Sequence, residues 1–222
     1  MSLWQKLGLT NKMTRERLAR FVARYASEQE TLDIGCGGAP YAKYFPHRIG
    51  FDHAAGPGVD VVGDAHALLF PDNYFERILC TEVLEHLIDP PKAVAEMRRV
   101  LKPGGLLILT TRFVFPIHDA PHDYWRFTRF GLEHLFRDWE IVELVEEAGS
   151  LGTLAVLAQR LGLQVQFYGG RLTKLFILAG ARLLQGFSWL VRVEYGDVTH
   201  AEQAKHPVLV SGYYLAARRR NS

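Results

Sequence analysis

Residues 32–40 read Leu-Asp-Ile-Gly-Cys-Gly-Gly-Ala-Pro, and this stretch decides the fold of the 222-residue chain. An apolar run that turns through glycines is typical of the first strand of a doubly wound sheet, because glycine lets the backbone turn tightly and approach a ligand. A dinucleotide fingerprint would place a third glycine where this chain has Pro40. The carboxylate of Asp33 also disfavours a pyrophosphate and favours a cationic ligand.

Strand and helix patterns alternate along the first two thirds of the chain. Apolar spacing predicts a helix over 14–28, with Thr14 as its cap, and a helix over 91–101 that is stopped by Pro-Gly-Gly at 103–105. Because parallel strands need crossover helices, this alternation predicts a parallel sheet covered on both faces. The predicted strands are 31–35, 48–52, 59–64, 75–80, 105–111, 139–147 and 206–217, with a further helix over 128–136.

Two more carboxylates follow predicted strands. Asp52 ends the second strand, where an acidic residue can accept hydrogen bonds from both hydroxyls of a ribose. Asp64 ends the third strand, where it could accept from the exocyclic amine of an adenine. Either acid alone could equally be a helix cap or a solvated loop end. Together with Asp33 they lie at the carboxyl ends of adjacent strands, where doubly wound folds bind ligands.

These motifs resemble those of the class I S-adenosylmethionine-dependent methyltransferases, and within them the methyltransferase type 11 group. The resemblance covers about residues 30 to 136 and implies a Rossmann-like α/β fold, a seven-stranded sheet with an antiparallel last strand, and a cofactor-binding core over 30–147. The family's third glycine is Ala39 here, which we expect to alter the turn slightly and to leave binding intact. The resembling stretches are LDIGCGGAP at 32–40, GFD at 50–52, VVGDAH at 61–66, FERILCTEVLEHLIDP at 75–90 and RRVLKPGGLLILTT at 98–111.

The resemblance also implies a cofactor and its contacts. S-adenosylmethionine is expected to lie across the glycine turn, the acids that end the second and third strands, and the loop after the fourth strand. The expected cofactor-binding residues are Asp33, Gly35, Cys36, Gly37, Asp52, His53, Gly63, Asp64, Ala65, Thr81, Glu82 and Val83.

Methyl transfer is an in-line displacement, so the enzyme must hold the acceptor in a dry pocket and take up a proton if the acceptor is a hydroxyl. His86 follows the fourth strand, beside the expected cofactor, although its role could be structural. His118, His122 and Asp123 follow the fifth strand and are the other candidate catalytic residues.

The segment around these last residues is expected to be the acceptor loop, because Tyr124-Trp125 can stack on a sugar or another ring. The stretch HDYWRFT at 122–128 resembles an element of type 11 proteins from polysaccharide and secondary-metabolite gene clusters. The alternative is a structural connection in which Asp123 pairs with Arg126 and Trp125 fills the core. His118 and His122 are four residues apart, but Pro121 opposes the helix that would join them at a metal, so no metal site is expected.

A helical insertion is predicted over 148–205, between the last two strands. Within it, residues 151–193 carry five basic residues and no acidic one, and the polar positions share an arc of roughly 120°, which leaves most of the helix apolar. Such a helix could cap the sheet or the acceptor pocket, form a homodimer interface, or lie on an anionic membrane through 171–193. The apolar run 175–193 is interrupted by charged and amide side chains, so no spanning helix is expected.

Composition narrows the remaining classes. With 26 Lys and Arg against 24 Asp and Glu, the net charge of +2 does not describe a nucleic-acid binder. Two cysteines, Cys36 and Cys80, are too few for a disulfide framework and are expected to be small buried side chains. No apolar core of a signal peptide is found near residue 1, so a cytoplasmic location is expected.

The sequence therefore predicts an enzyme that methylates a small molecule, a sugar or a lipid-linked acceptor, most favourably at oxygen. Two other classes stay open. A non-catalytic methyltransferase-like partner protein is disfavoured by the complete set of strand-end acids and glycines. A nicotinamide-dependent oxidoreductase is disfavoured by Pro40 and by the carboxylate of Asp33.

Overall fold

The structure is a computed structural model that describes residues 10–196 and 203–221. The chain divides into two compact units. The sheet unit comprises residues 18–113, 117–145 and 213–222, and the helical unit comprises residues 1–17, 114–116 and 146–212.

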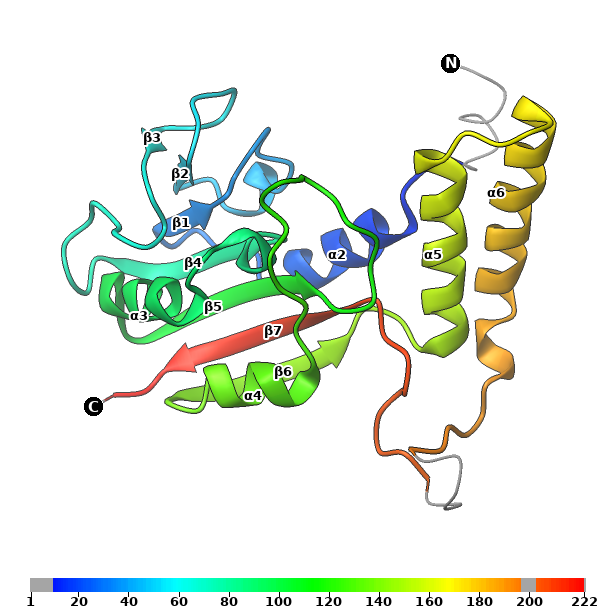
Figure 1. The fold of residues 1–222 in the computed structure, drawn as a ribbon. Coiled ribbons are helices and arrows are strands. Elements are labelled where there is room, and N and C mark those ends of the chain that lie inside the picture. The colour runs from blue at the N-terminus through cyan, green and yellow to red at the C-terminus, as the bar shows by residue number, and fades with distance from the viewer. Residues whose placement is uncertain (1–9, 197–202, 222) are drawn as a thin grey trace. The chain divides into compact units, whose positions relative to one another are not determined.

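The sheet has seven strands in the order β3-β2-β1-β4-β5-β7-β6 (Figure 1). Strands β1 to β5 run parallel to one another, and β7 runs antiparallel to β5, which confirms the predicted fold class. The strand order reverses between β1 and β4, and ligands of doubly wound sheets bind outside the carboxyl ends of the strands at such a switch point. The strands are β1 Thr31–Ile34, β2 Arg48–Asp52, β3 Val61–Val62, β4 Phe75–Thr81, β5 Leu101–Arg112, β6 Trp139–Glu146 and β7 Gly212–Arg219.

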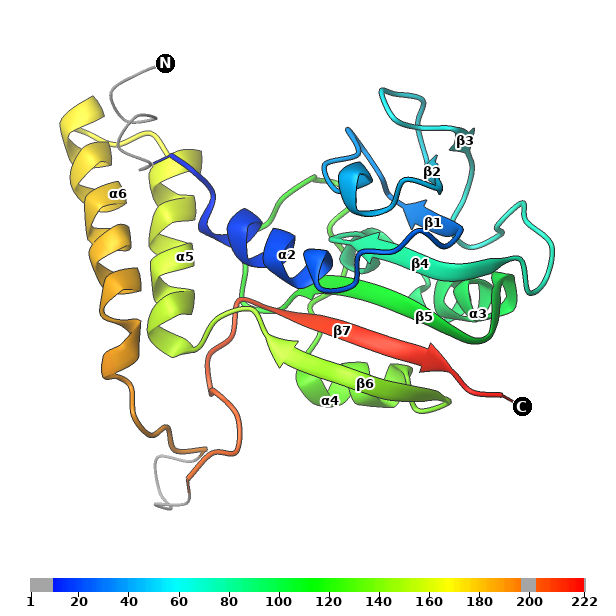
Figure 2. The same ribbon diagram turned by 180° about the vertical axis from the view of Figure 1, so that it is seen from behind.

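Helices lie on both faces of the sheet. Figure 1 shows α3 (Pro90–Val100) and α4 (Arg129–Leu135) in front of it, and Figure 2 shows α2 (Met13–Ala23) on the opposite face. Helix α3 begins at Pro90, one residue before the predicted start, where Asp89 accepts a hydrogen bond from the backbone N–H of Lys92 and proline takes the first helical position. On the opposite face, Phe21 and Val22 pack into a core that includes residues of β4, β5 and β7.

Several predicted boundaries are wrong. Helix α2 begins at Met13 and ends at Ala23, so Thr14 lies in its first turn and does not precede it. Strand β7 begins at Gly212, later than the predicted residue 206. Strand β5 includes the Pro-Gly-Gly at 103–105, because the register with β4 shifts there and a bulge accommodates the extra residues.

The helical unit contains α5 (Ser150–Gln164) and α6 (Gly170–Gly186), followed by a short 3-10 turn. Gly162 of α5 permits close packing, because a β-carbon there would lie 2.8 Å from Leu178 of α6. The opposite side of α6 carries exposed apolar side chains at helical spacing, which we call the α6 stripe: Leu172, Phe176, Leu183 and Phe187. Within the described ranges, no helix combines the length and apolar character needed to cross a membrane.

Candidate active site

A cavity of about 860 Å³ opens at the carboxyl ends of the strands on the β1-β2-β3 side of the sheet. All of its lining residues belong to the sheet unit. One part of the lining comes from the strand ends: Ile34, Gly35, Phe51, Asp52, His53, Gly63, Asp64, Ala65 and His66. The other part comes from the segments after β4 and β5: Glu82, Val83, His86, Leu87, Ile88, Asp119, Ala120, His122 and Tyr124.

The glycine turn after β1 brings the backbone close to the segment after β4. Gly35 has a φ of +67°, and a β-carbon on it would lie 2.2 Å from Cγ2 of Val83. Ala39, which replaces the family's third glycine, adopts a φ of +51° in the left-handed region that favours glycine. The turn therefore keeps a glycine-like backbone conformation at Ala39.

The acids that end β2 and β3 both lie at the cavity. Asp52 accepts hydrogen bonds from the backbone N–H groups of Gly37 and His53, at 3.0 and 2.8 Å. These bonds connect the glycine turn to β2 and orient the carboxylate. Asp64 accepts from the backbone and ring of His66, and these bonds hold the pKa of the Asp64 carboxyl below its usual range. Both carboxylates thus lie at the cavity, where the sequence predicts ribose and adenine contacts.

Four of the expected cofactor-binding residues do not line this cavity. Asp33 is buried, 3.5 Å from the guanidinium of Arg48, and burial raises its pKa to about 7. The thiol of Cys36 lies 3.4 Å from the backbone oxygen of Gly58. Gly37 and Thr81 are the other two. Each of these four residues lies within two positions of a lining residue in the chain.

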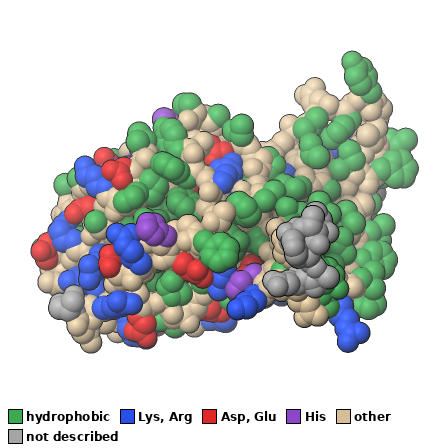
Figure 3. All heavy atoms as spheres, turned by 60° about the horizontal axis from the view of Figure 1, so that its bottom comes forward, with side chains coloured by type: hydrophobic (Ala, Val, Ile, Leu, Met, Phe, Trp, Pro, Cys, Tyr) green, Lys and Arg blue, Asp and Glu red, His purple; other side chains and the backbone are tan. Residues whose placement is uncertain are grey.

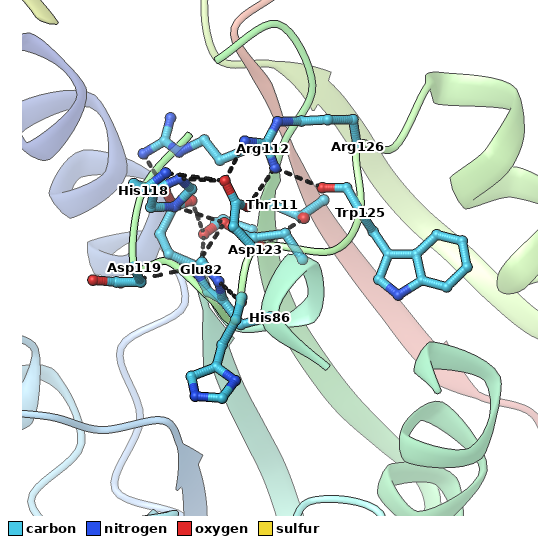
Figure 4. A network of polar contacts seen from close by, with 12 residues as sticks. Glu82, His86, Thr111, Arg112, His118, Asp119, Asp123, Trp125 and Arg126 are labelled. Atoms are coloured by element: carbon cyan, nitrogen blue, oxygen red, sulfur yellow. Dashed lines mark hydrogen bonds and ion pairs between the residues drawn. The ribbon is translucent and has the colours of Figure 1, made fainter. Parts of the chain in front are cut away.

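Glu82 has a φ of +58° and projects from the end of β4 into a polar network (Figure 4). Its carboxylate accepts a 2.9 Å hydrogen bond from the hydroxyl of Thr110 and pairs with the buried Arg112. Both partners belong to β5, so the network fixes the turn after β4 against the next strand. Glu82 can therefore present a fixed carboxylate at the cavity.

The segment after β5 returns to the residues that follow β4. The backbone N–H groups of Tyr124 and Trp125 both donate to the backbone oxygen of Glu85, at 3.0 and 3.1 Å. His86 and His122 then lie close together, with Nδ1 of His86 2.6 Å from the backbone oxygen of His122. Both histidines line the cavity, as do Asp119 and Tyr124 of the same segment.

Asp123 has a different environment from the other candidate catalytic residues. Both of its carboxylate oxygens lie 2.6 Å from Arg126, and Oδ2 also accepts from the backbone N–H of His118 (Figure 4). The Arg126 guanidinium holds the pKa of this carboxyl well below its usual range. The pairing of Asp123 with Arg126, which belongs to the structural alternative, is present and makes Asp123 a poor proton acceptor. The other part of that alternative, in which Trp125 fills the core, is not observed, because Trp125 is 44% exposed.

His118 does not line the cavity, and it contacts a residue that sequence reasoning missed. That residue is Glu85, which is fully buried and whose Oε2 accepts a 2.8 Å hydrogen bond from Thr111. Burial, reinforced by the negative charge of Glu82, raises the pKa of Glu85. The motif Glu-Val-Leu-Glu-His at 82–86 indicates Glu85, because it places a carboxylate directly before the candidate catalytic residue His86.

Comparisons with known proteins agree with this geometry. A family model described as a methyltransferase domain matches residues 10–166. The ubiquinone/menaquinone biosynthesis C-methyltransferase UbiE of Bordetella avium is 39% identical over 85 residues, which are 36% of this chain and 33% of that protein. The uncharacterized methyltransferase YcgJ of Bacillus subtilis is 34% identical over 120 residues, 46% of this chain and 45% of that protein. The chain therefore spans less than half the length of these curated relatives.

A solved structure shows the same fold at low sequence identity. The [4+2]-cyclase SpnF superposes with a TM-score of 0.60 and 18% identity over 93% of this chain and 82% of that chain. At this identity the likeness concerns the fold alone. Because the family model covers most of the sequence, including the glycine turn and the strand-end acids, the chain belongs to the methyltransferase domain family and has the class I fold of S-adenosylmethionine-dependent enzymes.

Proposed function

We propose that the chain transfers the methyl group of S-adenosylmethionine to a hydroxyl of a small-molecule or carbohydrate acceptor. The observation that carries the proposal is one cavity with two different parts. The first has the glycine turn and strand-end carboxylates that suit a nucleoside, and the second has histidines and a tyrosine that suit a polar acceptor. Its volume of about 860 Å³ lies within the usual range of ligand sites.

The residues present fit the cofactor. Gly35 and Val83 both line the cavity, and the left-handed backbone and missing β-carbon of Gly35 allow the turn to pack against Val83 there. Asp52 can accept hydrogen bonds from ribose hydroxyls, and the acidic surroundings suit a ligand that carries an ammonium and a sulfonium. When bound, the cofactor supplies an electrophilic methyl group.

The chain's own residues would position the acceptor and remove its proton. His86 and His122 both line the cavity, and an imidazole can act as a general base. We place the acceptor oxygen between them, with one imidazole as the proton acceptor. Tyr124, next in the same lining, offers an aromatic face and a hydroxyl to a sugar or a ring.

Calorimetric titration with S-adenosylmethionine tests the first half of this proposal. Asp52→Asn is expected to weaken binding, whereas Asp138→Asn, an exposed acid outside the cavity lining, is the matched control. Absence of binding to the wild-type chain would reject the methyltransferase function. Binding of a nicotinamide dinucleotide in its place would support the oxidoreductase alternative.

Transfer of a labelled methyl group tests the second half. Extracts are incubated with the chain and the labelled cofactor, and the labelled product identifies the acceptor. Alanine replaces His86 and His122 one at a time, and loss of a general base typically lowers turnover about 10²–10⁴-fold. Turnover at the wild-type rate in both variants would contradict the assigned role. A chain that neither binds the cofactor nor transfers its methyl group would favour the non-catalytic partner protein.

We also propose that the helical unit contacts anionic membranes through the α6 stripe, which would bring the enzyme to lipid-linked acceptors. Phe176 and Leu183 are 68% and 62% exposed, and hydrophobic side chains are abundant on the surface that α5 and α6 form (Figure 3). Five basic residues and no acidic one lie in 151–193, which suits an anionic lipid surface better than a neutral one. A homodimer through the same stripe is the competing outcome.

A further inference from the structure

Three metal-ligating side chains converge beside the cavity. Glu85 and His86 lie in the 3-10 turn after β4 (η2, Leu84–His86), and His118 comes from the segment after β5. One ligand atom from each lies within 4.8 Å of the other two. Nε2 of His118 and Nε2 of His86 lie 3.8 and 4.0 Å from the same atom, Oε1 of Glu85.

Contacts on the far side of both rings orient their Nε2 atoms toward Glu85. Nδ1 of His86 lies 2.6 Å from the backbone oxygen of His122, which can only accept, so Nδ1 carries the proton and Nε2 of the neutral ring presents a lone pair. Nδ1 of His118 faces Oδ2 of Asp123 at 3.5 Å. Metal-binding histidines commonly use their second nitrogen in this way, because a carbonyl or carboxylate partner fixes the tautomer and the ring.

Glu85 gives an independent sign of a cation. Its side chain is fully buried, and Oε2 is satisfied by Thr111, but Oε1 has no hydrogen-bond donor among the described residues. A buried carboxylate oxygen without a donor is costly. The atoms nearest to Oε1 on the two histidines are the Nε2 nitrogens, so three possible ligand atoms surround one space.

The charge of the surroundings agrees with this. Four acidic side chains and two guanidinium groups lie in the network, so the acidic side chains outnumber the basic ones by two, and this composition favours a bound cation. Asp119 is placed to supply a further ligand, since its Oδ2 lies 3.9 Å from Nε2 of His86 and its side chain is exposed. The charged members are Glu82, Glu85, Asp119, Asp123, Arg112 and Arg126.

We propose that Glu85, His86 and His118 bind a divalent transition-metal ion of the Zn²⁺, Co²⁺ or Fe²⁺ type. Two imidazoles and a carboxylate favour these ions over Mg²⁺ and Ca²⁺, which prefer oxygen ligands. In a tetrahedral site with bonds of about 2.0–2.1 Å, ligand atoms stand roughly 3.4 Å apart. The observed separations, 3.8 and 4.0 Å from Oε1 and within 4.8 Å throughout, would therefore have to shorten when the ion binds.

This site differs from the pair considered in the sequence. The expectation that no metal binds rested on Pro121, which opposes a helix joining His118 to His122. The structure instead brings His118 to His86, with ring centroids 4.7 Å apart. His86 and Asp119 line the cavity, so the ion would face it. If the proposed function is correct, the ion would polarise the acceptor hydroxyl and leave His122 as the proton acceptor.

Cobalt binding tests the site without cofactor or acceptor. The full chain, free of any polyhistidine tag and stripped with a chelator, is titrated with Co²⁺ while visible absorption and heat are recorded. We expect about one ion per chain, displaced by Zn²⁺. His118→Asn and Glu85→Gln should each weaken binding at least about 100-fold, since each removes a ligand. His134→Asn, an exposed histidine of α4, is the matched control and should retain binding.

The outcomes separate the proposals. No cobalt absorption and no heat with the wild-type chain would overturn the metal site, and so would binding that all three variants retain. If Glu85→Gln fails to fold by circular dichroism, His118→Asn decides, because its ring is partly exposed. Methyl transfer is measured separately, so a chain that binds cobalt but never transfers a methyl group would reject the proposed function and leave the metal site standing.

Discussion

Val83 occupies the space into which a β-carbon on Gly35 would project, 2.2 Å from its Cγ2. The turn after β1 and the segment after β4 can meet only because residue 35 has no side chain. Both residues line the cavity, so the contact forms part of its wall.

Gly35→Ala is therefore expected to lower the free energy of unfolding by at least about 2 kcal/mol, because it adds a left-handed backbone penalty to a steric clash. It should also weaken cofactor binding. Gly38→Ala is the matched control, since a β-carbon there meets no atom within 4 Å and its φ is not in the left-handed region. Urea unfolding and calorimetry measure both effects. Equal values for the two variants would contradict the role assigned to the contact.

At Ala39, in the same glycine turn, a substitution is expected to raise the free energy of unfolding. It holds a φ of +51°, which costs an L-residue roughly 1–2 kcal/mol relative to glycine. Glycine loses more chain entropy on folding, which offsets part of this gain. Ala39→Gly should therefore stabilise the fold by a net of about 0.5–1 kcal/mol. Ala42→Gly, in the following 3-10 turn, is the control and should destabilise. Urea midpoints compare the two, and a destabilised Ala39→Gly variant would show that the turn prefers alanine.

The strand-end side of this cavity could be predicted from the sequence, because the apolar pattern locates the strands and each acid follows the end of one. Parallel strands place their carboxyl ends at one edge, so Asp52 and Asp64, which follow different strands, could be expected at one ligand. The cluster of Glu85 and His118 depends on how a segment of irregular backbone folds back after β5. No periodicity describes such a segment, so its contacts with the turn after β4 could not be predicted. Pro121 correctly excluded a helix but said nothing about this return.

Asp33 should make stability depend on pH. Its pKa rises from 3.8 to about 7 in the folded chain, chiefly through burial. An acid with a raised folded pKa contributes stability that is complete below the unfolded pKa and is lost as pH rises through the folded value. Asp33→Asn removes this pH-dependent contribution. The free energy of unfolding of the variant, relative to that of the wild type, should therefore rise between about pH 4 and pH 8. Urea unfolding without cofactor measures the difference, with exposed Asp138→Asn as control. A difference that stays constant over this range would contradict the burial argument.

Membrane binding through the α6 stripe predicts a charge-dependent partition. Phe176→Asp and Leu183→Asp each place a carboxylate where the stripe would enter the lipid interface, so both should abolish flotation with vesicles that contain phosphatidylglycerol. Leu69→Asp, at a residue 71% exposed in the sheet unit, is the control and should still float.

The dependence of flotation on salt separates electrostatic attraction to the lipid from apolar insertion into it. Basic residues attract anionic lipid over roughly a Debye length, about 8–10 Å near physiological salt, so flotation should weaken as salt rises and should be absent with phosphatidylcholine alone. Failure of the wild-type chain to float with acidic vesicles at low salt would reject the membrane contact. A concentration-dependent dimer that Phe176→Asp dissociates would then assign the stripe to a second copy of the chain, because the same apolar side chains would be buried by protein.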